Sequence, residues 1–324
     1  MVTIKDIARE AGVTFVTVSR ALNNEPGVSD TKREVIKRIA EQMNYVPSLA
    51  AKKLAQRQPS MLGMIWPKLK GLFFYDLSFE IQKEASQRGL QVIFSMAGAG
   101  EAMRTFNRYF VDYVVFWRPD WNPTLEFLQE KERFRGDMLL LGGWKSEKAH
   151  SLSIDRIGAV RNAVHHLAEL GHTRVGFIGQ LDLHKYNGYM QGVAESRIEY
   201  RQDYVIDPLQ QTFRHRFIQL MSQADRPSAL VVDSQGSLHP TIRLLRELDL
   251  KVPEHMSLVV YDDIPDLENF DVPLTTSGPS IEYLAKRTLD ILTGQVVTDN
   301  SYKWVQEEVN CTLTVRGSTM PWKG

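Results

Sequence analysis

The sequence predicts an all-helical N-terminal domain followed by an α/β body that contains two doubly wound parallel sheets. At 324 residues the chain is long enough for two or three domains, and 43% of its residues are hydrophobic. In the first two dozen residues, apolar side chains recur at helical spacing on both sides of a tight turn. Beyond residue 60, short apolar runs alternate with amphipathic stretches, which is typical of parallel strands covered by helices.

The N-terminal stretch predicts two short helices joined by a glycine. The apolar residues of the first helix recur every three or four positions and share one face: Ile4, Ile7, Ala8 and Ala11. Gly12 ends this helix, and Thr14 can act as the N-cap of a second helix. The inward face of the second helix carries Val18, Ala21 and Leu22. This is the helix-turn-helix arrangement, in which the second helix can enter the major groove of DNA.

The outward face of the second helix distinguishes a DNA-reading helix from an ordinary packed pair. Phe15, Val16 and Arg20 point away from the predicted core, where a solvated helix would carry Glu, Lys or Gln. Apolar groups at the start of a helix can contact thymine methyls, and an arginine can donate twice to guanine. We therefore favour DNA reading over the alternative of two simply packed helices.

These segments resemble one family of bacterial regulators. Thr3-Ile4-Lys5-Asp6-Ile7-Ala8, Ala11-Gly12-Val13 and Thr17-Val18-Ser19-Arg20 through Leu22-Asn23-Asn24 resemble the lac repressor/galactose repressor (LacI/GalR) family. The resemblance implies binding to double-stranded operator DNA. In this domain it implies contacts from Thr3, Thr14, Phe15, Val16, Thr17, Ser19, Arg20 and Asn23.

The charge and cysteine content limit the possible partners and compartment. Residues 1–60 hold ten Lys and Arg against six Asp and Glu, which leaves 29 basic and 33 acidic residues in the remainder. The head is therefore about +4 and the body about −4, as expected for a phosphate-binding head. With one cysteine, no signal-peptide pattern and no long apolar run, we expect a bacterial cytoplasmic protein without membrane segments, nucleoid-associated when bound.

A third predicted helix completes the head, which we place at residues 1–46. Ser29 or Asp30 can cap it. Its apolar face carries Val35, Ile36, Ile39, Ala40 and Met43, and its other face carries Lys32, Arg33, Lys37 and Arg38. These basic residues can bind phosphate, but for any single one a solvated position is the better interpretation.

Residues 47–59 predict a hinge helix and linker. Pro47 and Ser48 can begin a short helix that is too short to be stable alone in water. The alternative is a plain interdomain linker. In the resembling family this segment orders on the operator, pairs with its dimer mate in the minor groove and inserts a leucine that kinks the duplex. The resemblance therefore adds Ser48, Ala51, Lys53 and the wedge Leu54 to the DNA contacts.

The body, residues 60–324, predicts seven buried strands: 62–66, 91–94, 113–117, 138–141, 174–179, 229–232 and 258–261. Between them lie helical stretches at 75–88, 156–170, 239–248 and 281–293. This region also resembles the family through Ser153-Ile154-Asp155, 166–179 and Tyr261-Asp262-Asp263-Ile264-Pro265. The resemblance implies two subdomains of the periplasmic-binding-protein type, one of about 60–170 and 279–304, the other of about 171–278 and 305–324.

The predicted effector cleft departs from the family pattern. Phe73 and Phe74 retain the usual aromatic pair, whereas Lys185 replaces an arginine and loses its planar fork. Asp233-Ser234-Gln235 replaces the usual Ala-Asn-Asp, and Ser277-Gly278-Pro279 replaces Arg-Gln-Pro. By the resemblance, the effector contacts are Phe73, Phe74, Trp144, Asp155, Lys185, Ser234 and Asp262. The alternative is structural for four of them: Phe73 and Phe74 can be core residues, Lys185 a solvated residue and Asp262 a helix cap.

Enzyme chemistry has little support in the sequence. Gly98-Ala99-Gly100 follows a strand, but Met103 stands where a dinucleotide fingerprint needs a third glycine, so a nucleotide-binding enzyme is a weak alternative. The histidines at 165, 166 and 172 lack a carboxylate at metal-ligand spacing. We expect no enzyme activity, catalytic residues, metal or cofactor.

The sequence thus predicts a transcriptional repressor of carbohydrate-utilisation genes. It would bind a pseudo-palindromic operator as a homodimer, under the control of a sugar or sugar derivative bound between the two subdomains. The alternative is a sensor with the same fold but no classical sugar effector.

Overall fold

The structure is a computed structural model that describes residues 2–45, 61–66, 71–117, 123–143, 148–181, 184–295 and 304–323. The chain divides into two compact units, Met1–Gln58 and Pro59–Gly324. Each unit is described by itself. Among the described residues, no helix is both long and apolar enough to cross a membrane.

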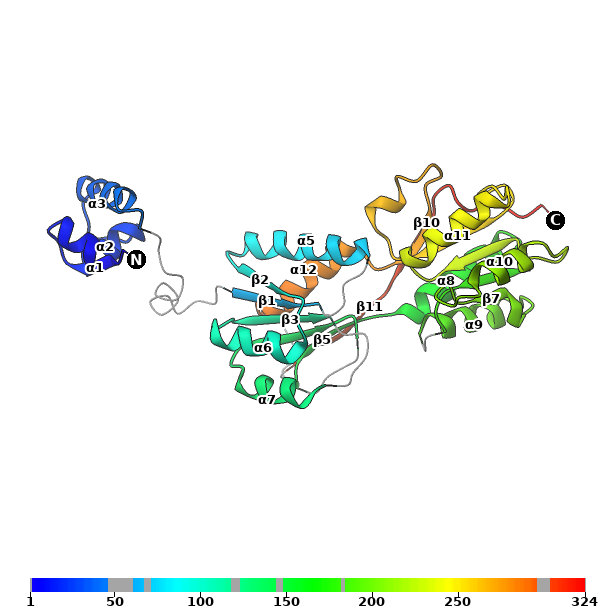
Figure 1. The fold of residues 1–324 in the computed structure, drawn as a ribbon, viewed down its shortest axis with the longest axis horizontal. Coiled ribbons are helices and arrows are strands. Elements are labelled where there is room, and N and C mark those ends of the chain that lie inside the picture. Colours follow the sequence, from blue (N-terminus) through cyan, green and yellow to red (C-terminus); the bar gives the residue numbers. More distant parts are fainter. Residues whose placement is uncertain are drawn as a thin grey trace. The chain divides into compact units, whose positions relative to one another are not determined.

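In residues 2–45, the part of the first unit that the structure describes, three helices pack together (Figure 1). Its helices are α1 (Ile4–Glu10), α2 (Phe15–Leu22) and α3 (Asp30–Gln42). Six fully buried apolar side chains form the core: Ile7, Ala8, Val18, Ala21, Ile36 and Ala40. The predicted inward faces of α1 and α2 are confirmed by this core. Val35 differs from its expected place, because its side chain is 45% exposed on α3.

The second unit begins with a sheet whose strands are all parallel, in the order β11-β5-β4-β3-β1-β2. The strands are β1 (Met61–Ile65), β2 (Gln91–Ser95), β3 (Tyr113–Trp117), β4 (Asp137–Leu141), β5 (His150–Ile154) and β11 (Gln306–Val309). Helices α5 (Leu72–Gln87) and α12 (Ile281–Leu292) cover one face, and α6 (Ala99–Arg108) and α7 (Leu125–Arg133) cover the other (Figure 1). We call this lobe the first subdomain.

The second subdomain is built on a sheet in the order β12-β10-β9-β8-β6-β7, in which only β12 is antiparallel to its neighbour. The strands are β6 (Val175–Ile178), β7 (Val205–Ile206), β8 (Ala229–Val232), β9 (Ser257–Tyr261), β10 (Thr275–Gly278) and β12 (Thr312–Thr314). The helices pack in two pairs, α8 (Arg156–Glu169) with α9 (Lys185–Glu195), and α10 (Phe213–Met221) with α11 (Gln235–Glu247). Short 3-10 helices occupy Gln202–Tyr204 and Pro265–Leu267.

The chain crosses between the subdomains three times. After β5 it enters α8, which packs on α9 and on the second sheet, so this crossing lies near residue 155 and earlier than the expected 171. The reason is that the apolar face of α8 is buried in the core of the second subdomain. The second crossing follows Gly278, between β10 and α12. The last one lies between β11 and β12, a few residues beyond the expected 305.

The predicted fold class, a helix-turn-helix head with two doubly wound parallel sheets, is confirmed. In both sheets the strand order reverses beside one strand, β1 in the first and β6 in the second. Ligands of such folds bind outside the carboxyl ends of the strands at these switch points. The side chains that follow β1, β3, β6, β8 and β9 are therefore the ones to examine.

Candidate nucleic-acid interface and effector cleft

The second helix of the head, α2, is fixed at its start by a side-chain cap. The Thr14 hydroxyl accepts a hydrogen bond from the Thr17 backbone N–H at 3.3 Å and lies 3.0 Å from the Thr17 hydroxyl. This bond satisfies one of the amides that a helix start leaves without an intrahelical partner. The N-cap expected at Thr14 is confirmed, and the cap fixes the backbone of the first turn.

The opposite side of α2 is open to solvent. Phe15 and Val16, in the first turn, are 57% and 43% exposed. Arg20 and Asn23 are exposed further along, and Thr17 and Ser19 are half-buried. Exposing large apolar side chains to water is unfavourable. The exposed Phe15 and Val16 beside Arg20 therefore favour a binding surface over a solvated helix face.

Thr3 is held in a capping box at the start of α1. Its hydroxyl donates to Asp6 Oδ2 at 2.7 Å, and its backbone N–H donates to the same oxygen at 3.0 Å. These bonds lower the pKa of Asp6. Thr3 thus has a structural role in α1, and its contact with DNA stays a prediction. The other predicted contacts Ser48, Ala51, Lys53, Leu54 and Trp144 lie outside the described residues.

An aromatic cluster lies on the first subdomain's side of the effector cleft that the sequence predicts. Phe73 is buried and Phe74 half-buried in the first turn of α5, with ring centroids 5.5 Å apart. Trp117, the last residue of β3, lies 5.5 Å from the ring of Phe73 and 5.1 Å from that of Phe74. The two phenylalanines therefore come together as expected. Trp117 was missed because the sequence placed it at the end of a buried strand.

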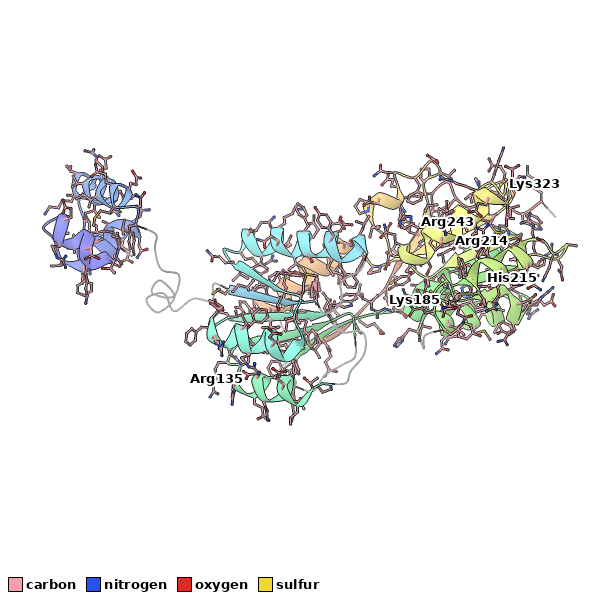
Figure 2. All side chains as sticks on the ribbon, in the orientation of Figure 1. Arg135, Lys185, Arg214, His215, Arg243 and Lys323 are labelled. Carbon is pink, nitrogen blue, oxygen red and sulfur yellow. The ribbon has the colours of Figure 1, made fainter. Side chains whose placement is uncertain are left out.

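Lys185 begins α9, on the side of the second subdomain that faces the first (Figure 2). Its Nζ donates to the backbone oxygen of Asp233 at 2.6 Å and lies 3.9 Å from the ring centroid of Tyr261. Both are favourable contacts for an ammonium group. The lysine therefore binds protein groups from two neighbouring strand ends.

The triplet that begins at Asp233 forms a closed hydrogen-bond network. The buried carboxylate of Asp233 accepts from the Gln180 backbone N–H at 2.8 Å, from the Ser234 hydroxyl at 2.9 Å and from the Ser237 hydroxyl at 2.5 Å. Ser234 is also the N-cap of α11, where its hydroxyl accepts from the Ser237 N–H at 3.3 Å. The predicted contact Ser234 thus lies at the strand end as expected, with its hydroxyl already engaged.

Asp262 follows β9 in a strained backbone conformation. Its φ is +78°, a region that residues with side chains rarely adopt. Burial raises the pKa of its carboxyl, while the charges of Lys185 and Arg156 act in the opposite direction. The turn depends on Gly278 of β10, because a Cβ there would lie 2.7 Å from the Asp263 nitrogen and 2.8 Å from the Asp262 Cα. The departure at Gly278 therefore shapes the position of Asp262.

Asp155 serves as the N-cap of α8. One of its carboxylate oxygens accepts from the Gly158 N–H at 2.7 Å. The next residue, Arg156, donates to the Gly142 carbonyl at 2.6 Å, and its guanidinium lies 5.9 Å from the Trp117 ring. The structural role of Asp155 is thus a helix cap, and its contact with an effector stays a prediction.

A second hydrogen bond between the subdomains, besides the one from Arg156 to Gly142, involves Gln235. The Gln235 side-chain oxygen accepts from the Leu72 backbone N–H at 3.1 Å. Leu72 is the first residue of α5, so its N–H has no partner within the helix. Gln235, the first residue of α11, thus caps a helix of the other lobe. No motif in the sequence pointed to this contact.

The described residues give no support to metal or dinucleotide chemistry. No group of three or more His, Cys, Asp or Glu in them could hold a metal ion. At Gly100 a Cβ would lie 2.6 Å from the Glu126 side chain, so this glycine allows α6 and α7 to approach each other. That packing accounts for the glycine at position 100.

Two family models match the chain. The model for bacterial regulatory proteins of the lacI family matches residues 3–48, and the model for a periplasmic binding protein-like domain matches residues 164–319. A relative named HTH-type transcriptional repressor PurR, from Vibrio atlanticus, is 24% identical over 95% of this chain and 96% of its own length. Catabolite control protein A from Priestia megaterium is 25% identical over 89% and 94%.

Solved structures share the fold. A lac repressor dimer bound to operator and the anti-inducer ONPF has a TM-score of 0.78 at 23% identity, covering 98% of this chain and 99% of that chain. A transcriptional regulator CelR–cellobiose complex has a TM-score of 0.62 at 23% identity, covering 98% and 100%. A LacI family regulator from Enterococcus faecium with bound ribose has a TM-score of 0.67 at 18% identity, covering 82% and 100%.

Proposed function

We propose that this chain, a member of the LacI family of bacterial regulatory proteins, represses transcription by reading a pseudo-palindromic operator with α2. The observation that carries the proposal is the exposed face of that helix, with Phe15, Val16 and Arg20 opposite a buried core. The lacI-family model covers this unit. Thymine methyls suit the two apolar side chains, and the guanidinium suits the O6 and N7 atoms of guanine.

A homodimer would place two copies of α2 in successive major grooves. Two apolar surfaces of the second unit support self-association. On α5, Leu72, Tyr75 and Phe79 share one side, with Tyr75 68% and Phe79 59% exposed. Along α11 a groove of about 340 Å³ is lined by apolar residues such as Leu250 and Phe270 and by charged residues such as Arg246 and Asp271. Exposed apolar surface of this kind is typical of interfaces between subunits.

The effector we propose is a sugar or sugar derivative bound between the subdomains. The Phe73–Phe74–Trp117 cluster offers aromatic surface, and Lys185 and Asp262 offer polar groups at the strand ends of the other lobe. Structural neighbours hold ONPF, cellobiose and ribose. A ligand that favours one angle between the subdomains would change operator affinity, and operator would change ligand affinity by the same factor.

A regulator without a classical sugar effector is the second candidate. The observation that favours it is that Lys185, Asp233 and Gln235 already bind other protein groups. A panel of sugars and sugar phosphates, screened by thermal shift on the full chain, separates the two. Stabilisation by a sugar supports the first candidate, and no stabilisation across the panel supports the second.

The DNA-binding proposal is tested by selecting duplexes from a random pool with the full chain. We expect enrichment of a pseudo-palindrome, and we expect Arg20→Ala to flatten the preference at one base pair in each half-site, by about 1–3 kcal/mol. As controls on the same helix, Thr17→Ala and Ser19→Ala should leave the preference at that base pair unchanged. No enriched sequence with the wild-type chain would overturn the proposal. Equal losses by Arg20→Ala on selected and random DNA would make Arg20 a phosphate contact.

A further inference from the structure

Arg33, near the start of α3, has a place in the head that its sequence pattern did not indicate. It is half-buried, and its guanidinium donates to four backbone carbonyls. One nitrogen donates to Arg20 and Ala21 at 3.4 Å each, and the other donates to Glu25 at 2.9 Å and Val28 at 3.3 Å. The side chain therefore holds the end of α2 and the turn that follows it.

Two of these carbonyls, those of Arg20 and Ala21, lie in the last turn of α2, where they also accept hydrogen bonds from the backbone N–H groups of Glu25 and Asn24. The last carbonyls of a helix have no intrahelical partner, and a cation there also complements the helix dipole. The turn carries a second tie to α3, because Lys37 Nζ donates to the Asn24 side-chain oxygen at 2.9 Å. Asn24 has a left-handed φ of +56°, so this tie fixes a residue that is costly to place.

The same turn lies against the side chain of Arg20. Gly27 has a φ of +95°, and a Cβ at this position would lie 3.3 Å from Arg20 Nη1. The guanidinium of Arg20 therefore runs along the backbone of Gly27. A displacement of the turn would therefore change the directions that the Arg20 guanidinium can adopt.

We propose that Arg33 is a positioning residue that holds the 23–28 turn and thereby aims Arg20 at its base. This inference rests on the proposed function of α2 in reading DNA. Arg33 itself does not contact DNA, because its donors are directed at the carbonyls of the turn. A guanidinium supplies a planar fork of five N–H donors, whereas a lysine in its place supplies a point charge.

The opposing interpretation is that Arg33 binds a DNA phosphate. The two differ in salt dependence. A lost phosphate contact lowers the slope of log affinity against log salt by about 0.9 per contact, equally on all sequences. A lost positioning contact leaves the slope unchanged and lowers the preference for particular bases.

The test applies the random-pool selection and a salt titration to full-length Arg33→Lys, with Arg38→Lys on the exposed side of α3 as the matched control. We expect Arg33→Lys to reduce, by about tenfold, the preference at the base pair that Arg20→Ala flattens. The salt slope and the preferences elsewhere should match those of the wild type. Arg38→Lys should change neither quantity.

Two outcomes would overturn the inference. In the first, the wild type enriches a site and Arg33→Lys has the same base preferences. In the second, Arg33→Lys weakens the preference equally at all positions of the site, which is the result expected of a merely structural residue. If Arg33→Lys does not fold, Gly27→Ala replaces it in the test. This variant alters the same turn beside Arg20 and should reduce the preference at the same base pair. A wild-type chain that enriches nothing overturns the proposed function, and this inference with it.

Discussion

The head and the predicted effector cleft present their candidate recognition side chains in opposite ways. In the head, Phe15, Val16 and Arg20 stand exposed on α2, while Thr14 and Arg33 fix the backbone beneath them. In the cleft, Lys185 and Gln235 are bonded to other groups of the protein. Both regions derive from one family pattern, yet one keeps its recognition groups open and the other engages them internally.

This difference has an energetic consequence. DNA can meet the side chains of α2 without displacing a protein contact. A ligand in the cleft must replace hydrogen bonds that the protein already makes, so its net gain per bond is small. We therefore expect the chain to discriminate between DNA sequences without an effector.

The largest effect on this contrast should come from Gly278→Ala. The added Cβ would lie under 3 Å from backbone atoms of Asp262 and Asp263, so the strained turn must shift, at a cost of about 1–3 kcal/mol. Chemical denaturation measures the loss. Gly236→Ala is the matched control, since its Cβ would meet only the Ser234 hydroxyl at 3.8 Å. Equal stabilities of the two variants would show that Gly278 does not shape the cleft.

A smaller effect is expected from Thr14→Ala in the head. Removing the N-cap of α2 should cost about 1 kcal/mol of stability, measured by thermal unfolding of the full chain. Ser29→Ala at the start of α3 should cost less, because Ser29 is an N-cap without a side-chain cap bond. A larger loss at Ser29 than at Thr14 would contradict the view that the reading helix is fixed by its own cap.

The smallest effect is expected from Gln235→Ala, which removes the hydrogen bond that Leu72 donates across the two lobes. Its loss should cost about 0.5–1.5 kcal/mol. The direct measurement is hydrogen exchange at the Leu72 amide, which should become faster. Gln82→Ala on the exposed side of α5 is the control and should leave this amide unchanged. If Gln235→Ala also leaves Leu72 protected, the two lobes are held together by other contacts.

Much of the fold follows from apolar patterning. All seven predicted strands form. Six are apolar runs that the core buries, and β2 forms at the sheet edge although its Phe94 is 42% exposed. Strands β5 and β10 were not predicted, because their sequences are not apolar runs. Polar and apolar residues alternate in β5, and β10 consists of polar residues and a glycine. The buried segment Thr275–Gly278 is stable because its polar groups are paired, as when the Ser277 hydroxyl donates to the Ala159 carbonyl at 2.7 Å. Such pairs depend on partners far away in the sequence.

The candidate sites divide in the same manner. The exposed residues of α2 could be predicted, since helical spacing alone assigns them to the outer face. The roles of Arg33 and Gln235 could not, because each depends on backbone groups brought near by the fold. The helix cap at Asp155 could not be predicted either, because only the structure shows that bond.

The central claim is that this chain reads a DNA sequence through an open, preformed helix. It is tested most directly by the affinities of the full chain for the selected duplex and for a scrambled duplex, at physiological salt and without any small molecule. Our account predicts binding to the selected duplex at least about 10³-fold tighter. Equal affinity for the two duplexes would contradict it.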